Sequence, residues 1–449
     1  MPPNAELPFA CIGERILNMN IRLYNARILT MEEGRELFRG EIWIKNDRIA
    51  YVGAIEEIEE EGPGLPHIKW DYELDCENNL LMPGFKNAHT HSGMTFLRSY
   101  ADDLPLNEWL TKKVFPYEEK LSTGDIYEFT RLAIMEYVTS GITSVFDMYL
   151  SPDAVAEACR DTGMRCVLCG NVNDHTSNPE KMADEYERLN SFNPLITYRL
   201  GIHAEYTCSK ELIDRVNSVV HQYKAPFYCH LSETKDEVED CRKRYGLTPA
   251  MFLDGVGLFE YGGGVFHGVH LTEEEMDILE MRDVSVITNP GSNLKLASGI
   301  APVAQLAKKG INLAIGTDGA ASNNALDMFR EMYLVSTLSK IRENDAASFD
   351  AAKVLKMATW GGAQAMGLRD ANVLATGKFA DIIMIDMHQP NMQPENNIIK
   401  NLVYSGSKSN VKMTMIGGKI LYGDGRYNIG ESPERIYENC NRIAERILG

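Results

Sequence analysis

The chain has 449 residues, which is enough for one large domain or two domains of ordinary size. Its hydrophobic fraction of 44% is typical of a soluble globular protein, and no run approaches the roughly 18 apolar residues that a membrane span needs. The formal net charge of −19 would repel a phosphate backbone. We therefore expect no nucleic acid and no membrane as partners, and a small neutral or zwitterionic ligand instead.

The nine cysteines are scattered and odd in number, which indicates a reducing, cytoplasmic environment. Cys166 and Cys169 form a CxxC pattern, but they lie in a predicted strand, where positions three apart point to opposite faces. We interpret them as buried thiols. Residues 1–17 lack a basic segment followed by a long apolar run, so they do not form a signal peptide. Residues 1–18 are either a disordered extension or the product of an upstream start.

Both chain ends, residues 1–80 and 371–449, carry short strand-like runs broken by Gly, Asn and Asp. These runs are Ile21–Tyr24, Glu41–Ile44, Ile49–Val52, Ile382–Ile385, Val411–Ile416 and Lys419–Leu421. A final helix over Pro433–Leu448 follows a capping residue, Ser432. We expect the two ends to pair in space as a small β-sandwich that buries their apolar faces.

Residues 81–370 alternate short apolar runs with helical patterns, as parallel strands with crossover helices do. The predicted strands are Leu81–Ala88, Ile142–Met148, Met164–Val172, Thr197–His203, Pro226–Leu231, Gly264–His270, Val284–Asn289 and Ile311–Thr317. Helices are predicted over Asp125–Thr139, Pro152–Thr162, Pro179–Leu189, Lys210–Gln222, Lys235–Tyr245, Glu273–Met281, Ala301–Lys308, Leu326–Lys340 and Ala351–Met366. Eight β/α units predict a (β/α)₈ TIM barrel inserted between the two halves of the β-sandwich. A doubly wound open sheet is the alternative, but the chain has no GxGxxG or GxxxxGK turn.

Most of the ten histidines lie where predicted strands end, and in a TIM barrel those ends converge on the active site. His89 and His91 are two residues apart, so both imidazoles can reach one point on the barrel axis. His230, at the end of the fifth strand, is a candidate third ligand for the same ion. Asp318 follows the eighth strand, where a buried carboxylate is costly unless it binds a metal or another cation. These four residues predict a site for one divalent metal, zinc or iron.

Further candidates lie beside the predicted metal. Glu233, just beyond the fifth strand, is placed to shuttle protons, and Asp318 could accept a proton from the attacking water. His267 and His270 point to opposite sides of the sixth strand, and we favour His267 as the one that faces the water. His203 is a candidate substrate contact. The fourth strand offers no lysine that could bridge two metals, so we infer a single ion.

The motif Pro83-Gly84-Phe85 leading to His89-Thr90-His91, together with His230, His267 and Gly316–Gly319, resembles the amidohydrolase superfamily. The chain is most similar to the subgroup that deaminates S-adenosylhomocysteine, 5′-methylthioadenosine and related adenosines. The motifs of that subgroup are Asp103-Leu104, Glu108-Trp109-Leu110, His230–Thr234, Asn289-Pro290, Ser292–Leu296 and Asp318–Asn324. The likeness runs from about Ile21 to Gly425.

The resemblance implies that His89, His91, His230 and Asp318 bind zinc, that Glu233 shuttles protons and that His267 orients the water. It further implies that Glu108 holds the ribose hydroxyls, that His203 contacts the ring or sugar, and that Ser322 is an extra substrate contact. It also suggests a homo-oligomer.

The chain departs from the family pattern at two positions. Thr288 stands where a histidine is usual, and an arginine able to bind the homocysteine carboxylate is replaced near Gly170. Loss of that arginine would favour neutral methylthioadenosine or adenosine over S-adenosylhomocysteine.

Two alternatives remain open. The same barrel could act on another N-heterocycle, such as guanine, a pterin or a chloro-s-triazine. A non-catalytic scaffold is disfavoured, because such relatives lose metal ligands and this chain retains them.

Overall fold

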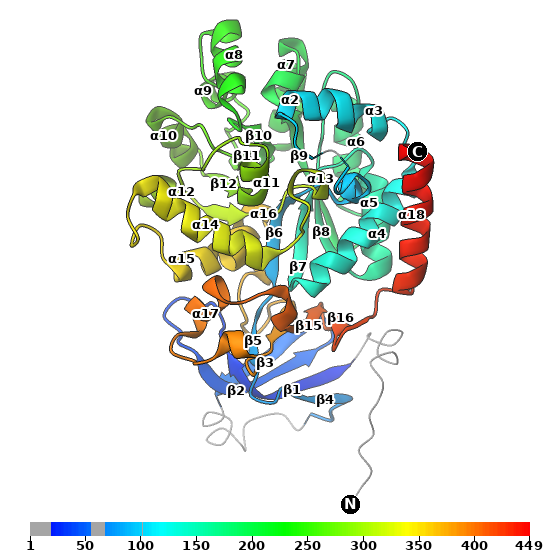
Figure 1. The fold of residues 1–449 in the computed structure, drawn as a ribbon, viewed down its shortest axis with the longest axis vertical. Coiled ribbons are helices and arrows are strands. Elements are labelled where there is room, and N and C mark those ends of the chain that lie inside the picture. Colours follow the sequence, from blue (N-terminus) through cyan, green and yellow to red (C-terminus); the bar gives the residue numbers. More distant parts are fainter. Residues whose placement is uncertain (1–18, 55–67, 101) are drawn as a thin grey trace, which may run out of the picture.

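The computed structural model describes residues 19–54, 68–100 and 102–449, so the expectations for residues 1–18 lie outside the described residues. It contains an eight-stranded barrel sheet and a separate nine-stranded sheet, which lies at one end of the barrel (Figure 1). The patterning of apolar residues predicts the barrel, and the two chain ends, predicted to pair as a small β-sandwich, form this nine-stranded sheet. Among the described residues, no helix combines the length and the apolar character needed to cross a bilayer.

The barrel is built from eight parallel strands that are neighbours in chain order. They are β6 (Phe85–Thr90), β7 (Ile142–Asp147), β8 (Arg165–Cys169), β9 (Ile196–Ala204), β10 (Phe227–Leu231), β11 (Gly263–His267), β12 (Val284–Thr288) and β13 (Leu313–Ile315). The first and last strands approach each other, since the backbone N–H of Asp318 donates to the carbonyl of His89 over 3.0 Å. The strand residues are almost all buried, as expected for strands covered on both faces. The predicted (β/α)₈ barrel is confirmed.

The crossover helices surround this sheet. They include α4 (Thr123–Thr139), α5 (Pro152–Thr162), α6 (Pro179–Leu189), α7 (Lys210–Tyr223), α8 (Lys235–Tyr245), α10 (Glu273–Met281), α12 (Val303–Lys308) and α14 (Met328–Glu343). Their starts follow local capping signals. In α4, for example, Ser122 and Asp125 form a reciprocal capping box that satisfies two backbone N–H groups.

Several helical segments differ from the prediction. The helix predicted over Ala351–Met366 contains a π-helical turn at Met357–Gly361 between α15 (Ala351–Lys356) and α16 (Gly362–Met366). Short helices that were not predicted include α2 (Leu106–Trp109), α3 (Phe115–Glu118), α9 (Pro249–Val256), α11 (Pro290–Lys295), α13 (Ala320–Asn323) and α17 (Ile398–Tyr404). Most of these have four to eight residues, which is too short for an apolar repeat to stand out.

The two chain ends together form the nine-stranded sheet. Its strands are β1 (Asn20–Ile28), β2 (Phe38–Lys45), β3 (Arg48–Ala54), β4 (Tyr72–Asp75), β5 (Leu80–Pro83), β14 (Ile382–Ile385), β15 (Val411–Ile416), β16 (Lys419–Gly423) and β17 (Arg426–Tyr427). The halves meet where β5 pairs antiparallel with β14 and parallel with β1. From this sheet the chain returns to the barrel as α18 (Pro433–Leu448), which packs against α4 (Figure 1).

One predicted strand is wrong in its extent. The run Leu81–Ala88 is divided at Gly84, so that Leu80–Pro83 joins the terminal sheet and Phe85–Thr90 begins the barrel. The chain passes so close to β7 at this point that a Cβ on Gly84 would lie 2.1 Å from Cγ2 of Thr143. Both pieces are fully buried, and a continuous apolar run does not reveal where one buried strand ends and the next begins.

A buried ion pair connects the barrel to the terminal sheet. The guanidinium of Arg165, at the start of β8, donates to both carboxylate oxygens of Asp381, with distances of 2.7 and 3.0 Å. The side chains are only 4% and 1% exposed. Asp381 also accepts the backbone N–H of Gly417 at 2.8 Å, so its charge is well compensated.

Candidate metal centre and active site

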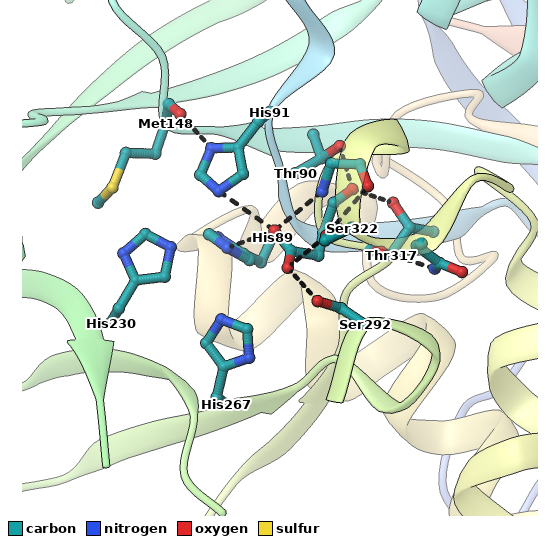
Figure 2. Close-up of polar contacts among 12 residues, drawn as sticks. His89, Thr90, His91, Met148, His230, His267, Ser292, Thr317 and Ser322 are labelled. Carbon is teal, nitrogen blue, oxygen red and sulfur yellow. Dashed lines mark hydrogen bonds and ion pairs between the residues drawn. The ribbon is translucent and has the colours of Figure 1, made fainter. Parts of the chain in front are cut away.

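The ends of three barrel strands bring four imidazole rings to one place. His89 is the fifth residue of β6 and His91 follows that strand, while His230 lies in β10 and His267 ends β11. One ring nitrogen from each of His89, His91 and His230 lies within 4.8 Å of the others, and the same limit holds for His89, His267 and Asp318. The rings face a common space between the strands (Figure 2). Four separate segments thus bring together atoms that could bind one ion.

The surroundings of the His89 side chain indicate whether this cluster fits a metal ion. Its side chain is completely buried, yet neither ring nitrogen has a hydrogen-bond partner among the described residues. Burial lowers the pKa of His89 to about 3, so the ring is neutral and keeps an unshared electron pair. A buried, unpartnered imidazole is costly unless something binds it. The donor set fits a divalent metal.

Two of the other rings are oriented by backbone carbonyls. Nδ1 of His91 lies 2.5 Å from the carbonyl oxygen of Met148 (Figure 2), and Nδ1 of His230 lies 2.7 Å from that of His203. A carbonyl can only accept, so each Nδ1 carries the hydrogen and each Nε2 is left for the cluster. Hydrogen bonds of this kind commonly hold metal-binding histidines in one tautomer.

Asp318 faces the histidines from the loop after β13. Its Oδ1 lies 3.2 Å from Nε2 of His91 and 3.5 Å from Nε2 of His89. Its Oδ2 accepts hydrogen bonds from the hydroxyls of Ser292 (2.6 Å) and Ser322 (2.9 Å). Burial opposes ionisation, but the interactions of the carboxylate with the nearby imidazoles of His89 and His91 outweigh it and hold the pKa of Asp318 well below its usual range. Asp318 is therefore an ionised carboxylate with one oxygen turned toward the cluster.

Glu233 and His267 form the opposite side of the site. Oε2 of Glu233 lies 3.7 Å from Nε2 of His267, and its Oε1 accepts the hydroxyl of Ser298 at 3.2 Å. Burial raises the pKa of Glu233, which favours its protonated form. Nδ1 of His267 lies 2.8 Å from the side-chain oxygen of Asn293, which leaves Nε2 facing Glu233.

The structure also separates the two histidines that follow the sixth strand. His267 lies in the cluster, whereas His270 is outside the cavity and donates from Nε2 to the carbonyl of Ser298. His267 has a φ of +73°, and this left-handed backbone turns the chain at the end of the strand.

These side chains lie at the base of a cavity of about 560 Å³, in the size range of sites for small molecules. His91, His203, His230, Glu233, His267 and Asp318 form part of its wall. Apolar and aromatic side chains form another part of the wall and include Trp109, Leu110, Phe115, Tyr149 and Leu296. A cavity lined by both polar and apolar side chains suits a flat heterocycle that carries a few polar groups.

A family model for the amidohydrolase family matches residues 80–421. The chain belongs to that family. Two relatives of this amidohydrolase carry the name 5-methylthioadenosine/S-adenosylhomocysteine deaminase. The Moorella thermoacetica protein is 41% identical over 91% of this chain and 95% of its own length. The Thermoanaerobacter pseudethanolicus protein is 40% identical over 96% of this chain and 100% of its own.

Solved structures agree with this assignment. An adenosine deaminase from Xanthomonas campestris with bound zinc superposes with a TM-score of 0.89 at 31% identity, over 96% of this chain and 98% of that one. The atrazine chlorohydrolase of Arthrobacter aurescens, complexed with zinc, reaches 0.85 at 20% identity over 94% and 100%. The second likeness concerns the fold alone.

Two of the predicted substrate contacts do not lie on the cavity wall of this amidohydrolase. Glu108 is half exposed, and its carboxylate pairs with Lys112 at 2.7 Å. Ser322 is buried behind Asp318, to which it donates. His203 does line the cavity, with Nδ1 3.2 Å from the hydroxyl of Thr207.

Glu118, which the sequence analysis did not single out, also lies on the cavity wall. Glu118, at the end of α3, lines the cavity and is only 8% exposed, and burial raises its pKa to about 7. Glu108 and Glu118 belong to the same helical segment. Which of the two carboxyl groups faces the cavity depends only on how this segment crosses the mouth of the barrel. The one signal in the sequence is that Glu118 follows the apolar run Val114–Tyr117.

Among the described residues, the cavity wall has no side chain with a permanent positive charge. In the part of the chain that the structure describes, no lysine or arginine lines it, and the loop after β8 contributes Asn171, Asn173, Asp174, His175 and Thr176. At Gly170 a Cβ would lie 2.9 Å from the backbone oxygen of Gly201. This position therefore has no room for a side chain unless the backbone moves.

Proposed function

We propose that this amidohydrolase deaminates an adenosine-type nucleoside, converting it and water to the 6-oxo nucleoside and ammonia. The observation that carries the proposal is the position of Glu233. Its carboxyl group faces the same cavity as the metal-ligand cluster, and burial raises its pKa. The names of the relatives and the adenosine deaminase neighbour support the same reaction.

His89, His91, His230 and Asp318 would hold one divalent ion, for which we propose zinc. Three imidazoles and one carboxylate suit zinc, and iron is the alternative. When bound, the metal would lower the pKa of water toward about 7 and so supply a hydroxide nucleophile at neutral pH.

The chain's own groups would then move the protons. Asp318, held ionised by its neighbours, accepts a proton from the attacking water. Glu233 in its protonated form donates to the ring nitrogen beside the amine-bearing carbon, then takes the remaining proton of the added hydroxyl group and carries it to the departing amine. The proton held by Asp318 restores the acid form of Glu233 for the next turnover. Nε2 of His267 lies on the Glu233 side of the cluster and orients the water. Ammonia leaves, and the carbon keeps the oxygen of the water.

We assign the ribose end of the substrate to the outer cavity. Glu118, rather than Glu108, is placed to accept hydrogen bonds from the sugar hydroxyls, because its carboxyl lies on the wall. His203 would contact the ring or the sugar.

Because no lysine or arginine among the described residues lines the wall, a carboxylate at the 5′ end would be desolvated without a cationic partner. We therefore propose that neutral 5′-methylthioadenosine or adenosine is preferred over S-adenosylhomocysteine.

Two further proposals concern the cellular location and the oligomeric state of the enzyme. A cytoplasmic location is supported by eight buried free cysteines among the described residues, which suit a reducing compartment. A homo-oligomer is proposed from the family resemblance alone.

The test follows ammonia release by the zinc-loaded protein with adenosine, 5′-methylthioadenosine, S-adenosylhomocysteine, guanine and a chloro-s-triazine. We expect ammonia from the adenosines, with kcat/KM for methylthioadenosine at least about tenfold above that for S-adenosylhomocysteine. Release from guanine alone, or chloride from the triazine, would contradict the proposed reaction. Equal rates with both adenosines would contradict only the assignment of the 5′ end.

Glu233→Gln tests the proton shuttle. The amide keeps the shape of the side chain but cannot carry the proton, so kcat should fall by at least about 100-fold while the zinc content is unchanged. Near-normal turnover in this variant would remove Glu233 from the mechanism.

A further inference from the structure

A buried carboxylate holds the backbone that carries Glu233. Oε1 of Glu237 accepts the N–H of Ser232 at 2.6 Å, and Oε2 accepts the N–H of Glu233 at 2.7 Å. Glu237 is 6% exposed and does not line the cavity. Both of its oxygens are thus used on two consecutive peptide groups, the second of which belongs to the residue proposed to shuttle protons.

This arrangement goes beyond ordinary helix capping. Glu237 is the third residue of α8, whose N-cap is Thr234. In a capping box the third residue accepts the N–H of the N-cap itself. Glu275 does this at the start of α10, where it accepts the N–H of Thr272 at 2.9 Å. The short hydrogen bonds of Glu237 reach one and two residues further back, to the turn between β10 and α8.

The same turn is held from the other side by the segment that follows His267. The carbonyl of Ser232 accepts the N–H groups of Val269 (3.1 Å) and His270 (2.9 Å), and Leu231 accepts that of Gly268 at 3.1 Å.

Ser232 has a φ of +50°, in the left-handed region that side-chain-bearing residues seldom occupy. A backbone conformation of this kind persists only where surrounding contacts hold it. The peptide groups around Ser232 therefore link the turn that carries Glu233 to the turn that carries His267.

We propose that Glu237 is a positioning residue for the deamination: its two hydrogen bonds to the Ser232–Glu233 backbone set where the Glu233 carboxyl lies relative to His267 and the reacting ring. The inference rests on the proposed function, because it assigns Glu237 a role through Glu233. Displacing a catalytic group by about 1 Å can cost on the order of 100-fold in rate, so loss of this support should be measurable.

Glu237→Gln is the variant of choice. An amide offers one acceptor oxygen where the carboxylate offers two, and its NH₂ group would meet one of the backbone N–H donors. The matched control is Glu275→Gln. Glu275 is also a buried third residue of a helix and accepts two backbone N–H groups, from Thr272 and from Ala250 at 3.2 Å. It lies outside the cavity wall.

The experiment is a double-mutant cycle on the zinc-loaded enzyme with methylthioadenosine, with Glu237→Gln made in the native and in the Glu233→Gln backgrounds. In the native background we expect kcat to fall by about 30-fold or more, with KM within about threefold and zinc content unchanged. In the Glu233→Gln background the same substitution should change kcat by less than about threefold, because the group it positions is already disabled. Glu275→Gln should leave kcat within about threefold.

A loss of kcat of equal size in both backgrounds, or a similar loss in Glu275→Gln, would mean that Glu237 acts through general stability and would overturn the proposal. Unchanged kcat in Glu237→Gln would overturn it as well. If Glu237→Gln fails to fold, Glu237→Asp takes its place, because it keeps the carboxylate but shortens the side chain by one methylene group. Its kcat is then measured in the same double-mutant cycle. Full activity in Glu233→Gln alone would instead refute the proposed shuttle, so the two failures are distinguishable.

Discussion

Replacing Ser322 by alanine should weaken metal binding and leave substrate binding unchanged. The hydroxyl of Ser322 is one of two that donate to Oδ2 of Asp318, at 2.9 Å beside the 2.6 Å bond from Ser292, and all three side chains are buried. A hydrogen bond to a charged group contributes about 1.5–3 kcal/mol. Substitutions of groups that support metal ligands typically cost 10- to 100-fold in affinity. We therefore expect the zinc dissociation constant of Ser322→Ala to rise by about 10- to 100-fold.

The assay is competition for zinc against a chromophoric chelator at fixed pH, with KM measured separately on fully loaded protein. Ser292→Ala should behave like Ser322→Ala. Ser339→Ala is the matched control, because Ser339 is also buried but its hydroxyl has no hydrogen-bond partner among the described residues. Unchanged zinc affinity together with a KM raised about tenfold would refute this reasoning. It would favour the direct substrate contact that the family resemblance implies for Ser322.

Two further predictions concern stability. Asp381→Asn leaves the buried guanidinium of Arg165 without its charged partner and should lower the free energy of unfolding in denaturant by about 3–5 kcal/mol. The exposed pair of Asp153 with Arg188 is the control: Asp153→Asn should cost less than about 1 kcal/mol, and equal losses would contradict the reasoning. The second prediction concerns Glu118, whose pKa is about 7 in the folded chain against an ordinary value of 4.5. As the pH rises, the carboxyl group therefore loses its proton in the unfolded chain before it does so in the folded chain. The free energy of unfolding should consequently fall between about pH 4.5 and pH 7. Glu118→Gln should reduce that fall by up to about 3 kcal/mol in chemical unfolding of the substrate-free protein across this range, and parallel curves would contradict the assignment.

Local sequence patterns were sufficient for the architecture. All eight predicted barrel strands overlap the observed ones, although the first does so only from Phe85 onward, and α5, α6, α8 and α10 match their predicted ranges from end to end. This follows because strand and helix periodicities are properties of neighbouring residues, as are caps such as Ser122 with Asp125. The gathering of His89, His91, His230 and Asp318 could also be anticipated, since parallel strands of one barrel must end at the same rim.

Only the tertiary structure decided features that depend on distant segments. Gly84 divides one apolar run between two sheets because β5 finds its partner in β14, some 300 residues later in the chain. Glu118, rather than Glu108, lies on the cavity wall because of how the segment from Leu106 to Glu118 crosses the barrel mouth. The contacts of Glu237 with the Glu233 backbone depend on how the turn before α8 folds back on itself. Composition and spacing determine which elements form and where their ends converge, whereas the direction of an individual side chain depends on long-range packing.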